Sequence, residues 1–251
     1  MRFIKILFLS LIIFFLSCSE SKNRNGIVIS GTIRNASGEK VVLRELDVDS
    51  FYDLDSATLD DIGFFRFICD PSDAGFYILR FVSGEYILLL VEKGDEVYVE
   101  ADLGKQPFNY TVTGNPGSVI LREFYTQTSR NLKKADSLRS VLMENRESPD
   151  FYRLSLSFDS IFLKIIEDQK ILERTFIKQN PGSLASLIVL NYKFGLTPVM
   201  KMEDDFSVFL DIDSALSIHY PDNKHVIFHH QRVIDYQRQE KEKQSLRKSN
   251  F

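Results

Sequence analysis

The spacing of apolar residues changes once along the chain. From residue 27 to about 113 they recur at every second position, the period of a strand, and later at every third or fourth, the period of an amphipathic helix. Ile27, Ile29 and Ile33, for example, fall on one face of a strand. The pattern predicts an α+β protein, with an N-terminal antiparallel β-sandwich or barrel-like domain over residues 27–114 and an α-helical domain over residues 115–236.

Seven or eight short strands are predicted in the first part, and glycines separate several of them. The segments are IVISGTIR, KVVLREL, DSATLD, GFFRFIC, GFYILRF, YILLLVE, DEVYVEAD and FNYTVTG. Turns of hairpin length join many of these segments, which favours an antiparallel sandwich or barrel.

Five helices are predicted in the second part. Their starting points are the residues after TGNPG, Ser148-Pro149, Asn180-Pro181, about residue 203, and Asp222. Serine or asparagine before proline is typical of a helix start, where the side chain caps the first turn and proline takes the first helical position. The last helix is expected to run into a charged tail, residues 237–251, that forms a solvated helix end.

The first residues follow a third pattern. Arg2 and Lys5 are followed by an apolar run from Ile6 to Leu16 that only Ser10 interrupts. Such a run spans roughly 17 Å as a helix, about half the apolar core of a bilayer. This length is typical of the apolar region of a signal peptide, which is predicted to cover residues 1–17.

Small Ser17 and then Cys18 follow where the apolar run ends, and the segment FLSC resembles a bacterial lipobox. In lipoproteins of that kind the cysteine thiol is lipidated, the chain is cut before it, and the new amino terminus is acylated. The resemblance implies lipidation of Cys18 and a tether over residues 18–26. In related lipoproteins, a residue other than aspartate directly after the cysteine suits transfer to the outer membrane. Ser19 at this position therefore implies an outer-membrane, periplasm-facing location. The alternative is an ordinary secretory signal with an incidental cysteine.

The charge balance excludes one class of partner. The sequence has 31 basic and 35 acidic residues, a formal charge of −4, and removal of residues 1–17 would take away two basic residues and no acidic one. A nucleic-acid-binding domain favours a basic surface, so no nucleic-acid partner is expected.

The cysteine count limits redox chemistry. If Cys18 carries lipid, Cys69 is the remaining thiol, and neither an intramolecular disulfide nor a C-x-x-C pair can form. Cys69 shares a strand face with Phe65 and Phe67, so a buried, inert thiol is expected. The strand aromatics could line a ligand groove, although filling a core is the favoured role for them.

The order of motifs resembles a known lipoprotein architecture. The motifs are ISGTI, the turn at Ser37-Gly38, LDSATLD, GFFRF, GFYIL, VEKGDEVYVEAD and TVTGNPGS, followed by FIKQNPGSLAS and YPDN. They resemble the β-rich domain of unknown function and the helical linker of thiol–disulfide interchange lipoproteins of Gram-negative bacteria. In those proteins a thioredoxin-like domain with a C-x-x-C pair follows, and no position here matches that pair. The resemblance therefore implies location and architecture, and no catalytic residue.

Two clusters suggest metal ligands. His225 and His229 are four residues apart, so they share a helix face and could hold a metal, with His219 or Asp222 as a further ligand. Val226 occupies the position of the glutamate in an H-E-x-x-H motif. An amphipathic helix start explains the same histidines, and no metal is predicted.

The second cluster is DVDSFYDLDS, which gathers Asp47, Asp49, Asp53 and Asp55. Clustered carboxylates are typical of calcium sites, but the sixth-position glycine and closing glutamate of an EF-hand are absent. A solvated connection between strands is the favoured interpretation.

The sequence thus predicts a membrane-anchored lipoprotein that acts as a non-catalytic binding or interaction module, with no cofactor. Its expected partners are the membrane, through Cys18, and an envelope protein or a thioredoxin-like protein. The alternatives are an accessory of thiol–disulfide exchange that works in trans with a separate thioredoxin-like protein, or a truncated member of that family.

The anchor is tested by Cys18→Ala. Because this substitution removes the lipid acceptor, we expect loss of radiolabelled palmitate incorporation and transfer of the chain from the membrane fraction to the soluble fraction. Cys69→Ala is the matched control and should keep both properties. Palmitate on the Cys18→Ala chain would contradict the prediction.

Overall fold

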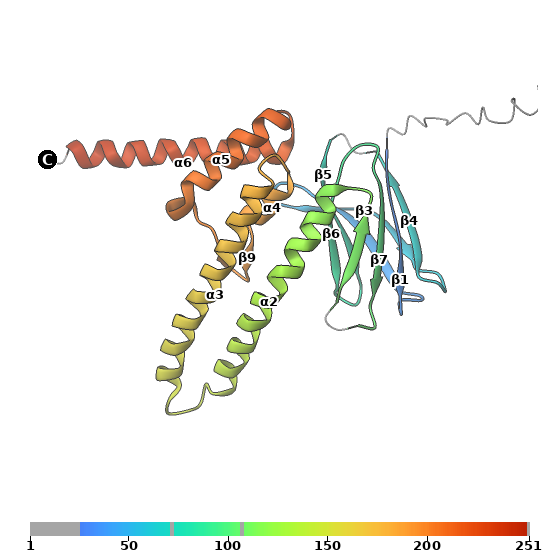
Figure 1. Ribbon diagram of the computed structural model, residues 1–251, viewed down its shortest axis with the longest axis horizontal. Coiled ribbons are helices and arrows are strands. Elements are labelled where there is room, and N and C mark those ends of the chain that lie inside the picture. The colour runs from blue at the N-terminus through green and yellow to red at the C-terminus, as the bar shows by residue number, and fades with distance from the viewer. Residues whose placement is uncertain (1–25, 71–72, 106–107, 250–251) are drawn as a thin grey trace, which may run out of the picture.

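The computed structural model describes residues 26–70, 73–105 and 108–249. The predicted signal peptide and Cys18 lie outside the described residues. Two four-stranded sheets are followed by helices (Figure 1), so the predicted α+β class is confirmed.

The first sheet has the strand order β4-β1-β7-β8. Its strands are β1 (Ile27–Arg34), β4 (Phe64–Cys69), β7 (Glu96–Asp102) and β8 (Tyr110–Thr113). β1 and β7 pair in parallel, whereas the other pairs of this sheet are antiparallel. A long connection permits the parallel pair, because the whole second sheet and β4 lie between β1 and β7 in the sequence.

The second sheet has the strand order β3-β2-β5-β6, and its pairs are antiparallel. Its strands are β2 (Lys40–Leu46), β3 (Phe51–Thr58), β5 (Gly75–Phe81) and β6 (Tyr86–Val91). β3 begins earlier than the segment DSATLD and takes in part of the aspartate-rich run. The interpretation of that run as a connection is therefore wrong for Asp53 and Asp55, which pair with β2.

The sandwich core lies between the sheets. Ile27, Ile29 and Ile33 are fully buried there, as the alternation predicts. Gly31 lies opposite Phe65, and a Cβ at this glycine would meet the Phe65 ring at 2.9 Å and the Val99 carbonyl oxygen at 2.2 Å. The glycine of ISGTI thus makes room for an aromatic side chain in the core.

The second sheet is covered on both faces. Ile87, Leu89 and Val91 of β6 pack toward the first sheet, whereas Leu88 and Leu90 pack with the helices. Phe76 of β5 also faces the helices. Burial of both faces explains why β6 is continuously apolar instead of alternating.

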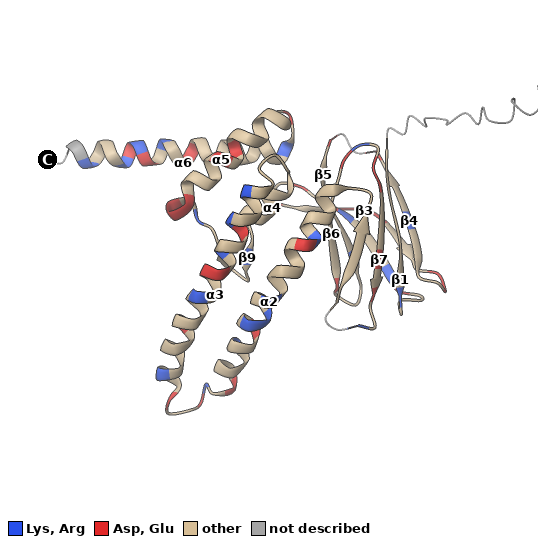
Figure 2. Cartoon of the chain, viewed as in Figure 1, with Lys and Arg blue, Asp and Glu red and all other residues tan. Residues whose placement is uncertain are grey.

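The helical part begins with a long hairpin that extends away from the sandwich (Figure 1). Its elements are α2 (Pro116–Glu144), α3 (Phe151–Gln179), α4 (Ala185–Leu190), β9 (Lys193–Phe194), β10 (Thr197–Pro198), α5 (Met202–His219) and α6 (Lys224–Ser249). Figure 2 shows charges of both signs along the hairpin and along the projecting part of α6. Within the charged tail, α6 continues to Ser249 and is exposed from residue 241 to residue 247.

Two predicted helix starts are wrong. α3 begins at Phe151, after a turn in which the Ser148 hydroxyl accepts a hydrogen bond from the Asp150 N–H at 3.2 Å. Asn180 ends α3 instead of starting α4, because its Nδ2 donates to the Phe176 carbonyl at 2.9 Å and its N–H bonds to the same turn. Asparagine and proline are also common just after a helix, so the pair Asn180-Pro181 marks an end here.

The motif TGNPGS joins the two parts of the chain. Gly114 has φ +96°, and a Cβ there would meet the Glu96 carbonyl oxygen at 1.9 Å. The Asn115 side chain then caps α2 by accepting from the Ser118 N–H at 2.9 Å. The buried Ser118 hydroxyl accepts from the Leu90 N–H at 2.9 Å and donates to the Leu90 carbonyl at 2.6 Å. α2 thereby satisfies the outer edge of β6.

We predict that Ser118→Ala destabilises the fold. The change leaves the Leu90 N–H and carbonyl without this partner, and a buried polar group left unsatisfied costs about 1–3 kcal/mol. The free energy of unfolding, measured by urea denaturation, should fall by that amount. Ser129→Ala is the control on the same helix, since the exposed Ser129 hydroxyl bonds only within α2. An equal loss in both variants would contradict the role of Ser118.

Candidate functional site

A cavity of about 730 Å³ lies where α4, α5 and α6 meet the second sheet. We call it the α6 cavity. Its volume is within the range of small-molecule sites, about 300–1,000 Å³. A hollow of about 800 Å³ lies between β7, β8 and α2, but none of its described lining residues has a buried polar atom that lacks a hydrogen-bond partner. The α6 cavity has two such residues, which distinguishes it.

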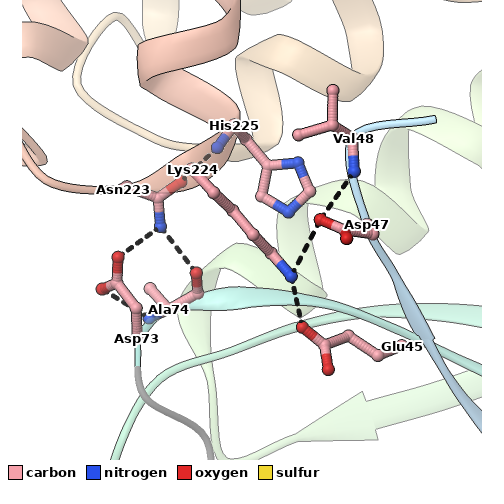
Figure 3. Close-up of polar contacts among 8 residues, drawn as sticks. All are labelled: Glu45, Asp47, Val48, Asp73, Ala74, Asn223, Lys224 and His225. Atoms are coloured by element: carbon pink, nitrogen blue, oxygen red, sulfur yellow. Dashed lines mark hydrogen bonds and ion pairs between the residues drawn. The ribbon is translucent and has the colours of Figure 1, made fainter. Parts of the chain in front are cut away.

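The start of α6 is fixed to the sheet by Asn223 (Figure 3). Its Nδ2 donates to the Ala74 carbonyl at 2.7 Å and to Asp73 Oδ2 at 2.9 Å, and its Oδ1 accepts from the His225 N–H at 3.0 Å. Asn223 is therefore both the cap of α6 and its attachment to β5.

Lys224 forms a second attachment (Figure 3). Its Nζ lies 2.5 Å from Glu45 Oε1 and 3.1 Å from Asp47 Oδ1, both at the end of β2. The hydrogen bond from Lys224 lowers the pKa of Asp47. Burial alone would lower the pKa of Lys224, but the two carboxylates outweigh it and raise that pKa. This ion pair also offsets the unfavourable placement of a cation at a helix N-terminus.

His225 and His229 both line the α6 cavity, as their four-residue spacing on one helix face predicts. The His225 ring packs edge-on against Phe76, with centroids 5.0 Å apart, and its Nε2 is buried without a hydrogen-bond partner. His229 is 2% exposed, and its Nε2 lies 3.0 Å from the Phe209 carbonyl oxygen. Since a carbonyl can only accept, Nε2 carries the proton and the buried Nδ1 is left as an unpartnered acceptor. Burial is the main cause that lowers both pKa values, so both rings are neutral near pH 7.

Arg232 extends the same face of α6. It follows His229 by three residues and lines the cavity. Its Nη1 donates to Asn191 Oδ1 at 2.9 Å, and its guanidinium lies 5.9 Å from the centre of the Phe228 ring. Burial lowers the pKa of Arg232.

The remaining walls are mostly apolar, with charged groups among them. The apolar lining includes Leu46, Phe76, Leu187, Leu190, Met200, Met202, Phe209 and Phe228. The ionisable lining residues other than the histidines and Arg232 are Asp47, Lys193, Lys201, Glu203 and Tyr236. Serine, threonine and cysteine are absent from the lining, as far as the described residues go. Such a lining matches the mostly apolar walls with a few polar groups that are typical of small-molecule sites.

The other candidate residues are not part of this site. His219 and Asp222 are exposed and do not line the cavity. A search of the described residues finds no group of three His, Cys, Asp or Glu side chains that could hold a metal ion.

The four aspartates of DVDSFYDLDS have different surroundings in the structure. Asp47 pairs with Lys224, and Asp53 pairs with Arg44. Asp49 is exposed in the turn after β2, and Asp55 is exposed in β3.

Cys69 is only partly buried, although the prediction placed it in the core. It lies at the end of β4 and packs against the sandwich core. Burial is the main cause that raises the pKa of its thiol. A raised pKa reduces the thiolate fraction and hence the reactivity.

Sequence reasoning missed Arg232 and Asn191. The positions 225, 229 and 232 follow the i, i+4, i+7 spacing of one helix face, which is a signal for Arg232. Asn191 ends α4, far away in the sequence, and only the fold brings it to Arg232.

A separate buried polar cluster lies between α2 and α3. Gln169 accepts from Asn131 at 3.1 Å and donates to Thr128 at 3.0 Å and to Glu173 Oε1 at 3.1 Å. Glu173 is fully buried, and its Oε2 has no hydrogen-bond partner. Burial raises the pKa of Glu173 to about 8, and nearby Asp205 adds to the shift. Its carboxyl is therefore largely protonated at neutral pH.

This shift predicts a pH effect on stability. The folded-state pKa of Glu173 lies above its ordinary value of 4.5, so its contribution is complete below that value and is lost as the pH rises through about 8. We expect Glu173→Gln to become more stable relative to the natural chain between about pH 5 and about pH 9. Urea unfolding across this range measures the difference. Glu167→Gln, at an exposed position of α3, is the control, and parallel curves for Glu173→Gln and the natural chain would contradict the prediction.

Comparisons with known proteins identify no family. No family model matches the chain, and no curated protein matches it. Among solved structures, it aligns with a 9R-lipoxygenase from Cyanothece PCC8801 at 12% sequence identity and a TM-score of 0.23. The alignment covers 51% of this chain and 29% of the lipoxygenase chain, and a similarity at this level carries no functional information. None of the described helices is long and apolar enough to cross a membrane.

Proposed function

We propose that this protein is a non-catalytic binding module that takes a small, largely apolar molecule in the α6 cavity. The observation that carries the proposal is the cavity of about 730 Å³, whose mostly apolar wall includes His225 and His229, each with a buried ring nitrogen that lacks a hydrogen-bond partner. A buried polar atom without a partner is costly. A ligand that forms a hydrogen bond with either ring would offset that cost.

The proposed location follows from the lipobox-like segment. Lipid on Cys18 would tether the module to the outer membrane, facing the periplasm. In that position, the cavity would meet molecules that leave or cross the membrane, and an envelope protein would be the natural partner. A role in thiol–disulfide exchange is the alternative proposal, and it rests on the family resemblance alone, because the raised pKa of Cys69 gives it no support.

The cavity is tested with a neutral apolar dye, N-phenyl-1-naphthylamine, on the full chain that carries Cys18→Ser. We expect the dye fluorescence to rise and to saturate at one dye per chain, since the cavity would shield it from water. The double variant Ile188→Phe, Met202→Phe adds bulk at two partly buried lining residues. It should weaken dye binding by about tenfold or more, because displaced ligand atoms lose their apolar contacts.

The matched control is Ile227→Phe, at an exposed position of α6 that does not line the cavity. Ile227→Phe should bind the dye with the same affinity as the Cys18→Ser chain that has no substitution in the cavity. Circular dichroism melting would show that each variant is folded. Equal dye affinity in the filled and unfilled chains would reject the cavity as the binding site.

A further inference from the structure

We propose that the α6 cavity selects an organic anion, an apolar molecule that ends in a single carboxylate, and that Arg232 binds this carboxylate. The inference rests on the proposed function, because it names the class of ligand that the same cavity takes. Four observations support it: the unmatched charge of Arg232, its place on α6, the charges of the lining, and the apolar walls.

Arg232 is a partly buried cation without an acid. Its Nη1 donates to Asn191, but no carboxylate of the described residues lies within 4.0 Å of its guanidinium nitrogens. A guanidinium has five N–H donors, and one carbonyl oxygen satisfies one of them. Desolvation of an unpaired charge is unfavourable, so an acid from outside the chain would stabilise Arg232.

Three other cations pair with acids, whereas the partly buried Arg122 binds the Tyr110 carbonyl and the Asn109 side chain. Lys170 and Arg174 lie 2.8 Å and 2.5 Å from the carboxylate of Asp205, which is 2% exposed. Lys224 lies between Glu45 and Asp47. Arg122 and Arg232 are thus the partly buried arginines that lack an acid among the described residues, and Arg232 has fewer acceptors, since it has a single hydrogen bond, to Asn191.

The place of Arg232 suits a ligand with one polar end. It stands on the same helix face as His225 and His229, and the Phe228 ring lies beside its guanidinium. Arginine presents two parallel N–H groups, which match the two oxygens of a carboxylate. A carboxylate at Arg232 would leave the rest of the ligand to the apolar walls.

The charges of the lining also favour an anion. Lys193 and Lys201 are exposed lining residues, and neither has a carboxylate within ion-pair distance among the described residues. Of the two acidic lining residues, Asp47 is paired with Lys224. Glu203 is then the one acid left to balance three cations in the described lining. This excess of positive charge attracts anions and repels cations.

The apolar walls distinguish a hydrophobic acid from a small inorganic anion. Phe76, Leu187 and Phe209 are buried residues that line the cavity. Phosphate alone would leave these walls unfilled, whereas an alkyl chain would gain about 0.8 kcal/mol for each methylene that it buries. A monocarboxylate of the fatty-acid type therefore fits both Arg232 and the apolar walls.

The test displaces N-phenyl-1-naphthylamine from the full Cys18→Ser chain with three probes that share a ten-carbon chain: decanoate, 1-decanol and decyltrimethylammonium. We expect decanoate to act at about tenfold lower concentration than 1-decanol, the effect of one charge-assisted hydrogen-bonded pair. Decyltrimethylammonium should be the weakest. If the dye binds and decanoate and 1-decanol displace it at equal concentrations, the inference of an anion site is overturned but the proposed function stands. If the dye does not bind at all, the proposed function is overturned as well.

The variants assign the preference to one residue. For Arg232→Gln, which removes the charge but keeps a polar side chain, the ratio of decanol to decanoate half-displacement concentrations should fall from about tenfold to near one. Arg232→Lys should keep part of the preference, because the charge remains while the paired donors are lost.

The matched control is Arg238→Gln, an exposed arginine of α6 that pairs with Asp235 and does not line the cavity. It should keep the full preference. A full preference in Arg232→Gln, with its fold verified by circular dichroism, would show that another group binds the carboxylate. Loss of the preference for decanoate in Arg238→Gln would contradict the proposal, because it would show that the overall charge of α6, and not contact with Arg232, selects the anion.

Discussion

Burial of β5 and β6 on both faces is the constraint on which the rest of the structure depends. One face of these strands closes the sandwich core, and the other supports the helices. Apolar contact is not directional, so it explains why the helices cover the sheet but not where they lie. Two polar contacts supply the direction: Ser118 fastens the start of α2 to Leu90, and Asn223 fastens the start of α6 to Ala74. The α6 cavity lies beside the second of these attachments, where the end of β2 faces α4, α5 and α6.

The sequence predicted the strands well because each has a clear period or a clear apolar run. The two-sided burial of β6 was not predicted, although YILLLV is continuous where a half-exposed strand alternates. The parallel pairing of β1 with β7 was not predictable, because strand periodicity says nothing about which distant strand is the neighbour. The helix ends near Ser148 and Asn180 were misplaced for another reason. Their residue types suit both the start and the end of a helix, and only the long-range packing decides between these two roles.

The candidate site was predictable only in its local part. The spacing of His225 and His229 gives a shared helix face in any fold. Arg232 belongs to that face too, but its importance depends on the absence of an acid near it, which is a property of the surrounding elements. Asn191 reaches Arg232 through the turn after α4, which sequence spacing cannot show.

Polar groups without a partner lie in the described fold between α2 and α3 and at the α6 cavity. They differ in whether protonation can remove the cost of burial, and this difference supports the function proposed for the α6 cavity. Glu173 lies in the closely packed seam between α2 and α3, does not line the cavity, and avoids the cost of a buried charge by holding its proton. It can therefore fix the register of the hairpin without any external partner. Arg232 cannot take the neutral form at ordinary pH, and the two imidazoles on its helix face are already neutral, yet each keeps one buried nitrogen without a partner. Filling the same space with apolar side chains would have been more stable, so an open cavity that keeps these groups is the kind of local cost that proteins retain at functional sites.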